Sequence, residues 1–549
     1  MISFRPTLSK LNKKLPLQLA AALLAGSSLI ASLLGLFRER LFNSAYYLTY
    51  PTGADAYRVA FSIPDFMFII LVSGALSVSF IPVFNQRLAS GNKKSAWELS
   101  TSIINLMALA TLVTSVLIII FAEPLVRYVV GPGLDESSRA LAVSMMRVIA
   151  VSPFLFAVAT VITSMQQAVG RFAFFALAPA VYNIGIIIGL LFFTNGINFF
   201  GWQVFEGGIM GVALGVVLGA ILQLVVSTFG LFGLGFDYRF KIYWKNKGFR
   251  KVLRLLPPRS LDQGIDYVNS IVETNLASRM VAGSVNAYQQ MTSLAYMPIN
   301  LIGVAISTAA FPKMTERLAE GRPDLFKSEL QTILRVIIWL ALPVTVVAIF
   351  ARGYIVNFIV NGGDPYMASI LAILAISILF RSVYFISARS FYAQQDTKTP
   401  LYISLFTIAL NITLAIWFSL GLDMGVHGLA WAAVIVSIVE VSTLFYFMSR
   451  RIKGLFDKPF VHAISRMASA AGLMAFITYL VVTMLPLSAT DQRFFDSFPK
   501  FVLITGISLL SYFLFSYLFK LKEVNPILLR VQKILFKRPE VKDEPKSDS

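Results

Sequence analysis

Charged side chains occur in two apolar stretches near the start of the chain, where a membrane span ordinarily carries none. Arg38, Glu39 and Arg40 lie in the first stretch, and Asp55, Arg58 and Asp65 lie in the second. A charge at bilayer depth is costly and usually faces a polar cavity, and arginine binds phosphate or carboxylate oxygens through two parallel hydrogen bonds. Three arginines with three carboxylates therefore predict a binding site for an anionic ligand. Its candidate residues are Arg38, Arg40, Asp55, Arg58 and Asp65. For Arg40 and Asp55, which flank the short linker, the alternative is an interfacial position with the charged group in water.

A second set of charged residues lies near the middle of the chain. Asp262, Asp266 and Glu273 are spaced so that all three share one face of a helix. Carboxylates on one face at membrane depth can bind Na⁺ or carry protons, so a cation-coupling role is one hypothesis for them. The alternative is that Asp262 pairs with Arg259 in water near the cytoplasmic entrance.

The composition identifies a polytopic membrane protein and excludes several kinds of site. Of 549 residues, 57% are hydrophobic and only 14% are charged, whereas soluble domains are about a quarter charged. Cysteine is absent and there are two histidines. These counts exclude disulfides and thiol nucleophiles, and they argue against a zinc site or a histidine-based catalytic triad.

Apolar runs long enough to cross the bilayer, about 20 residues each, recur through the whole sequence. They predict an all-α fold with about fourteen transmembrane helices. The predicted spans lie near 17–42, 54–84, 97–121, 140–168, 173–195, 208–232, 256–280, 285–312, 328–350, 366–392, 399–420, 428–449, 463–485 and 500–520.

Lysine and arginine are concentrated in alternate loops. Most of the 47 basic residues fall in segments on the same side as the N-terminus, with a dense group at 237–254. Because positive loops stay inside, both termini of this multi-pass membrane protein are predicted to be cytoplasmic. The net charge of +19 therefore reflects the basic residues of the loops on the cytoplasmic side. Its expected partner is the anionic surface of the membrane, not nucleic acid.

Weak internal similarity divides the chain into two halves. Asp55-Ala56-Tyr57 recurs as Asn286-Ala287-Tyr288, and Asn183 recurs as Asn411, at nearly constant offset. The matched helices begin on the same side, so the repeat is parallel. We therefore predict a six-helix lobe over 1–236, a pseudo-symmetric six-helix lobe over 237–455, two additional helices over 456–525 and a cytoplasmic tail over 526–549.

Several motifs resemble one family of membrane transporters. LGLFRERL, ADAYRVAFSIPD and GALSVSFIPVF near the start, with SVNAYQQMTSLAYMPINLIGVAISTAAFP and FYAQQDTKTP later, resemble the MurJ/MviN lipid II flippases. That family belongs to the multidrug/oligosaccharidyl-lipid/polysaccharide exporter superfamily. The resemblance implies two lobes around a cavity and movement of lipid-linked peptidoglycan precursor, an undecaprenyl-pyrophosphate lipid, to the outer leaflet by alternating access.

The resemblance also implies roles for single residues. The family's functional arginine of the first helix falls on Arg38, its second-helix aspartate falls on Asp55, and Asp65 occupies a position where asparagine is more usual. Two cavity arginines of the family are replaced here, one by Phe68-Ile69 and one within 291–294. We expect Arg58 to compensate for them and to pair with Asp55, one turn earlier, while the site is empty.

Two other functions remain as alternatives. One is export of another polyprenyl-linked oligosaccharide, or cation-coupled drug antiport, within the same superfamily. The other is an intramembrane enzyme acting on the same lipids, which would ordinarily need a large loop or a catalytic cluster. Because the predicted loops are short, we expect a monomeric transporter that is not an enzyme and has no cofactor beyond possible Na⁺ or H⁺ coupling.

Overall fold

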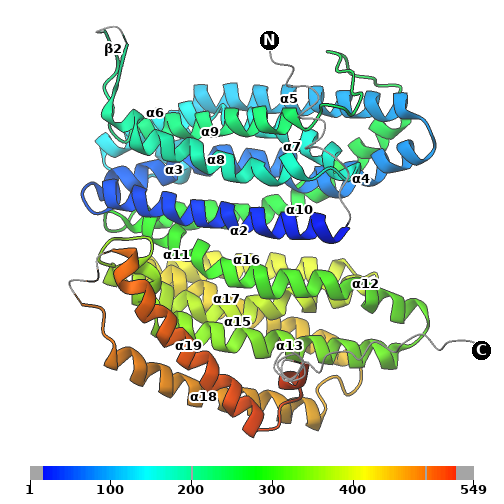
Figure 1. The fold of residues 1–549 in the computed structure, drawn as a ribbon, viewed down its shortest axis with the longest axis vertical. Helices are drawn as coiled ribbons and strands as arrows, with labels where there is room; N and C mark the ends of the chain where they lie inside the picture. Colours follow the sequence, from blue (N-terminus) through cyan, green and yellow to red (C-terminus); the bar gives the residue numbers. More distant parts are fainter. Residues whose placement is uncertain (1–16, 200–201, 489–490, 492, 527–549) are drawn as a thin grey trace, which may run out of the picture. The chain divides into compact units, whose positions relative to one another are not determined.

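A computed structural model of the chain describes residues 17–199, 202–488, 491 and 493–526, and these are almost entirely helical (Figure 1). The helices of the first half are α2 (Leu17–Phe42), α3 (Pro51–Phe68), α4 (Gly74–Ala89), α5 (Lys93–Pro124), α6 (Glu136–Ile149), α7 (Ser152–Ala168), α8 (Ala173–Leu191), α9 (Met210–Phe229) and α10 (Lys247–Ala277). Those of the second half are α11 (Ser284–Ile299), α12 (Ala305–Ala319), α13 (Pro323–Phe350), α14 (Arg352–Asn357), α15 (Pro365–Ala393), α16 (Lys398–Ile416), α17 (Val426–Arg451), α18 (Lys458–Met484) and α19 (Phe494–Leu518).

The helices lie where the apolar runs predict them. Among the described residues, 12 helices are long and apolar enough to cross a membrane. The other two predicted spans coincide with α3–α4 and α10, which are long helices that contain several charged residues of the two candidate sites. The all-α, multi-span fold is thereby confirmed. One detail differs, because β1 (Ile197–Phe199) and β2 (Trp202–Phe205) form a small antiparallel hairpin in the loop before α9.

Two long helices, one in each half of the chain, each consist of an α-helix, a π-helical segment and a second α-helix. The α3–α4 helix is interrupted by a π-helical segment at Ile69–Ser73, and α11–α12 is interrupted by another at Asn300–Val304. A proline lies shortly before each interruption, Pro64 in α3 and Pro298 in α11. Proline removes a backbone donor and allows the ladder of hydrogen bonds to shift. The matched positions of these segments agree with the internal repeat in the sequence.

The described chain forms two compact units. One comprises the described residues within Met1–Met291, Val356–Ile370 and Ile408–Ala433, and the other comprises those within Thr292–Ile355, Leu371–Thr407 and Val434–Ser549. Within the second unit, α18 and α19 pack against α13, where the Trp339 indole donates a hydrogen bond to the Ser516 hydroxyl (3.1 Å). The predicted lobe boundaries at 236 and 455 stay predictions.

Within the first unit, α8 packs between α2 and α9 (Figure 1). Its contact with α9 is backbone to backbone: a Cβ on Gly185 would lie 2.2 Å from the Cα of Gly219, and one on Gly189 would lie 2.5 Å from the Cα of Gly215. Small residues four apart allow membrane helices to approach this closely. This packing fixes α8 firmly and so positions Asn183, two residues before the first of these glycines, beside α2.

Candidate functional site

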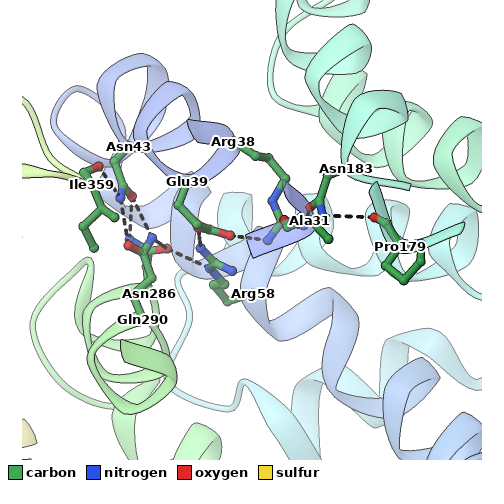
Figure 2. A network of polar contacts seen from close by, with 10 residues as sticks. All are labelled: Ala31, Arg38, Glu39, Asn43, Arg58, Pro179, Asn183, Asn286, Gln290 and Ile359. Carbon is green, nitrogen blue, oxygen red and sulfur yellow. Dashed lines mark hydrogen bonds and ion pairs between the residues drawn. The ribbon is translucent and has the colours of Figure 1, made fainter. Parts of the chain in front are cut away.

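The Arg38 side chain is held between α2 and α8. Its Nη1 donates to Asn183 Oδ1 (3.0 Å), and its Nη2 pairs with Glu39 Oε1 (2.5 Å). Asn183 is itself fixed, because its Nδ2 donates to the carbonyl oxygens of Ala31 and Pro179 (Figure 2). Arg38 thus lies at membrane depth with a defined orientation, and its side chain is 22% exposed.

Arg58 converges on the same carboxylate from α3. Its Nη2 pairs with the second carboxylate oxygen of Glu39, and its Nε donates to Asn286 Oδ1 (2.8 Å) of α11. The guanidinium carbon also lies 5.4 Å from the centre of the Phe42 ring, within range of a cation–π contact. Two guanidinium groups therefore share one carboxylate (Figure 2). An anion with several oxygens, such as a pyrophosphate, suits the position that Glu39 now occupies.

Asp55 lies beside this cluster but has a different partner from the one expected. Its carboxylate accepts the backbone N–H groups of Gly283 (2.7 Å) and Asn286 (2.8 Å), at the start of α11. The expected Asp55–Arg58 pair is wrong, because the free N–H groups and positive dipole end of α11 hold Asp55 while Arg58 pairs with Glu39. Asp55, which is 3% exposed, therefore joins α3 to α11 and is not an interfacial residue.

Arg40 and Asp65 lie outside the shared cluster. The Arg40 Nη1 donates to the carbonyl oxygens of Asn357 (2.6 Å) and Phe358 (3.2 Å), at the end of α14, where free carbonyls and the helix dipole attract a cation. Asp65 lies two helical turns beyond Arg58 on the same face of α3. Its carboxylate makes no hydrogen bond with the side chains that the structure describes.

Polar residues that the sequence analysis did not place in the site complete it. The Asn43 amide exchanges hydrogen bonds with Gln290 (2.8 Å in each direction) and donates to the Ile359 carbonyl oxygen (2.9 Å). Gln290 also donates to Asn286 Oδ1 (2.9 Å), which links this amide cluster to Arg58 (Figure 2). The available signal was that Glu39, Asn43, Asn286 and Gln290 are polar residues within apolar runs.

Of the three carboxylates predicted on one face of α10, only Glu273 has a described side chain. The side chains of Asp262 and Asp266 lie outside the described residues. Glu273 Oε1 accepts hydrogen bonds from Asn269 Nδ2 and Asn411 Nδ2, each at 2.9 Å. These contacts place a carboxylate and two amides from α10 and α16 together, which are oxygen-bearing groups of the kind that bind hard cations.

The later motif FYAQQDTKTP forms the turn between α15 and α16. Asp396 accepts the N–H groups of Lys398 and Thr399 (3.0 Å each) and so caps α16, and it also pairs with Arg451 of α17 (2.5 Å). Burial raises the pKa of the Asp396 carboxyl, but the hydrogen bonds from Thr399 and Arg451 outweigh it and hold the pKa at about 2. The motif therefore fixes the turn between α15 and α16.

With the geometry described, the chain can be compared with known proteins. A probable lipid II flippase MurJ from Thermotoga maritima is 26% identical over 487 residues, covering 87% of this chain and 91% of the relative. A protein with the same description from Buchnera aphidicola subsp. Schizaphis graminum is 26% identical over 498 residues, covering 88% and 92%.

Solved structures share the fold. A lipid II flippase MurJ in an inward closed conformation matches with a TM-score of 0.72 at 24% identity, covering 91% of this chain and 98% of that one. An inward-facing multidrug resistance MATE transporter matches with a TM-score of 0.65 at 16% identity, covering 78% and 96%. The family model described as lipid II flippase MurJ matches residues 44–497, and the chain therefore belongs to the MurJ family.

Proposed function

We propose that this protein moves lipid II, the undecaprenyl-pyrophosphate-linked peptidoglycan precursor, across the cytoplasmic membrane by alternating access. The observation that carries the proposal is the convergence of Arg38 and Arg58 on Glu39 inside the membrane. Guanidinium groups from two helices that already share one anion form a site for a pyrophosphate. Family membership and the names of the relatives support the same substrate.

The geometry suggests how the site works. Glu39 pairs with both arginines and offsets part of their positive charge, which lowers the cost of keeping them at membrane depth. An arriving pyrophosphate takes over these hydrogen bonds while the polyprenyl chain stays in the lipid. Asp55 and the amide of Asn286 connect α3 and α11 next to the same arginines. Occupancy of the site therefore acts directly on the contact between these two helices, which is the coupling that alternating access requires.

The test is complementation of a bacterium depleted of its own lipid II flippase, combined with flipping of labelled lipid II in proteoliposomes. We expect both assays to succeed. Growth rescue without lipid II movement, or movement only of another polyprenyl-linked oligosaccharide, would reject lipid II as the substrate and favour an exporter of that other lipid.

The proposed orientation places both termini in the cytoplasm. Because basic loops stay inside, we expect fusions within 237–254 to report a cytoplasmic position. Fusions within 193–207, the loop that contains β1 and β2, should report an outer position. The measurement is paired phosphatase and fluorescent-protein fusions. Finding the two loops on the same side would contradict the proposed path of the chain.

Coupling to a cation is a second proposal, supported by a match between the two halves. Arg38 lies four residues before the end of α2 and is held by Asn183, whereas Glu273 lies four residues before the end of α10 and is held by Asn411. Since Asn183 and Asn411 correspond in the internal repeat, equivalent places carry opposite charges. The first suits the anionic substrate and the second suits Na⁺ or H⁺.

We expect Glu273→Gln to remove the dependence of transport on a Na⁺ or pH gradient, because the neutral amide keeps the hydrogen bonds but loses the charge. The measurement is lipid II flipping in proteoliposomes with each gradient imposed separately. Glu206→Gln, which removes an exposed carboxylate from the β1–β2 loop, is the control. Unchanged gradient dependence in Glu273→Gln would exclude Glu273 as the coupling residue.

A further inference from the structure

The loop that precedes α10 contains an extended segment with two chemically different sides. Residues 236–246, here called the strap, read FDYRFKIYWKN and run without regular structure. In an extended chain, alternate side chains point in opposite directions. The even positions from Phe236 to Trp244 are aromatic or aliphatic, whereas the odd positions from Asp237 to Lys245 are charged except for Tyr243. The strap is therefore amphipathic across its width.

Asn105 fixes the middle of the strap to α5. Its Nδ2 donates to the backbone carbonyl oxygens of Arg239 and Lys241, both at 3.0 Å, and its Oδ1 accepts the Tyr238 hydroxyl (2.6 Å). One buried amide thus uses both its donor and its acceptor to hold a loop. Because these bonds satisfy the backbone carbonyls, the strap has a defined position on the helix.

Two further contacts hold the end of the strap. The Tyr243 N–H donates to the Ser102 hydroxyl (2.8 Å), and the Asn246 amide donates to the Ser95 carbonyl oxygen (3.0 Å). Asn246 Oδ1 also accepts backbone N–H groups at the start of α10. The strap consequently lies along the first part of α5 as a preformed structure.

The even side of the strap borders an apolar groove of about 930 Å³. The groove lies between the strap and helices α5, α7 and α9, and all five even-numbered strap residues from Phe236 to Trp244 line it. Ala108 of α5 and Val158 of α7 contribute to its walls, and Phe240 is 92% exposed. Its volume is in the upper part of the range for sites that bind small molecules.

The odd side of the strap borders a polar hollow of about 520 Å³ that meets the groove at Lys241. Within it Arg239 pairs with Asp237 (3.0 Å), and Glu98 accepts a hydrogen bond from Asn246 (3.3 Å). Lys94 and Lys241 form no ion pair with any residue that the structure describes, although the Lys241 Nζ lies 5.5 Å from the centre of the Tyr243 ring. The hollow thus carries three basic and two acidic side chains, so its net charge is positive, and Lys241 lies at the mouth of the apolar groove, where the two meet.

The position along α5 places this mouth at the membrane surface. The α5 helix has 32 residues, which is about 48 Å, and exceeds the roughly 30 Å of hydrocarbon. The strap is bonded to residues between Ser95 and Asn105, in its first turns, on the side predicted to be cytoplasmic. Tyrosine and tryptophan are the residues that favour this level of the bilayer.

We propose that the strap and α5 form a binding site for one anionic phospholipid of the inner leaflet, with its phosphate on Lys94 and Lys241 and an acyl chain in the groove. Charge complementarity commits the site to this occupant: the two ammonium groups match the negative cytoplasmic leaflet. The groove continues from the charged mouth down the lipid-facing sides of three membrane helices, which is the arrangement of a headgroup above its chain. The site involves none of the residues that bind Arg38, Arg58 or Glu273.

The test uses Trp244, which lines the groove and is 56% exposed. The full-length protein is placed in bilayers that contain either phosphatidylglycerol or phosphatidylcholine with brominated acyl chains, which quench tryptophan fluorescence. The difference in quenching between the unaltered protein and Trp244→Phe gives the contribution of Trp244. The Trp244 component should report a strong preference for phosphatidylglycerol. Each lysine near an anionic surface is worth about a fivefold change in affinity, so the two together predict a preference of about 25-fold.

Two matched variants separate a specific site from general attraction to the surface. Lys94→Gln with Lys241→Gln should reduce the preference to nearly that of phosphatidylcholine. Lys245→Gln with Lys247→Gln removes the same charge outside the polar hollow and should retain the preference. Ala108→Phe, which fills the groove, should reduce quenching by both lipids.

Three outcomes would overturn the proposal. Equal quenching by the two lipids in the unaltered protein would show that the lysines select no headgroup. An equal loss in both double-lysine variants would show attraction by overall charge alone. Release of brominated phosphatidylglycerol by undecaprenyl phosphate at a tenfold lower mole fraction would show that a polyprenyl chain, not a phospholipid, occupies the groove.

Discussion

Replacing Arg38 with alanine is expected to abolish lipid II flipping while membrane insertion and expression stay near those of the unaltered protein. Arg38 is the one arginine of the site that α8 holds in place, through Asn183 (3.0 Å). A hydrogen bond to a charged group contributes about 1.5–3 kcal/mol, so losing the bidentate contact should weaken substrate binding by about 10- to 100-fold. Arg38→Lys should recover activity only partly, because the ammonium keeps the charge but loses the planar fork.

The measurement is flipping of labelled lipid II in proteoliposomes, together with binding in detergent. Arg147→Ala is the matched control, since Arg147 is another arginine on a membrane helix but is exposed and donates to the Ile119 carbonyl oxygen (3.3 Å). Normal transport by Arg38→Ala would remove Arg38 from the site and leave the proposed role of the cluster without its central residue.

Replacing Glu39 with glutamine should have opposite effects on binding and transport. Glu39 pairs with both Arg38 and Arg58 and so occupies the place proposed for the pyrophosphate. Without this internal competitor the substrate anion should bind about tenfold more tightly. Transport should fall by a similar factor or more, because the two arginines have no carboxylate to return to when the lipid leaves and keep only their bonds to Asn183 and Asn286. Breaking a buried charge pair costs about 3–5 kcal/mol, so Glu39→Gln without added anion should also unfold at a lower temperature than the unaltered protein.

Thermal unfolding in detergent with and without inorganic pyrophosphate measures both effects on one sample. The anion should raise the midpoint of Glu39→Gln more than that of the unaltered protein, since it restores the missing negative charge. Glu123→Gln, which changes an exposed carboxylate near the end of α5, is the control and should respond like the unaltered protein. Pyrophosphate binding no tighter in Glu39→Gln than in the unaltered protein would show that Glu39 does not hold the anion's place.

The sequence by itself determined the architecture of this protein. Helices cover each of the predicted spans, because a bilayer requires about 20 apolar residues with every backbone group bonded internally, and this requirement is local. The repeat of Asp55 as Asn286 likewise anticipated the matched α3–α4 and α11–α12 helices, each with a π-helical interruption. The importance of charge within the first two spans also followed from composition alone, since charge is rare at that depth.

Only the tertiary structure decided which charges act together. Asp55 and Arg58 share a face of one helix, yet Asp55 bonds to the start of α11 and Arg58 bonds to Glu39 on α2. Arg40, two residues after Arg38, points instead to the end of α14. The reason is that successive side chains on a helix diverge by about 100°, so their partners depend on which helices pack on each side. Helix packing brings together residues far apart in the sequence, and neither spacing nor charge within one span specifies it.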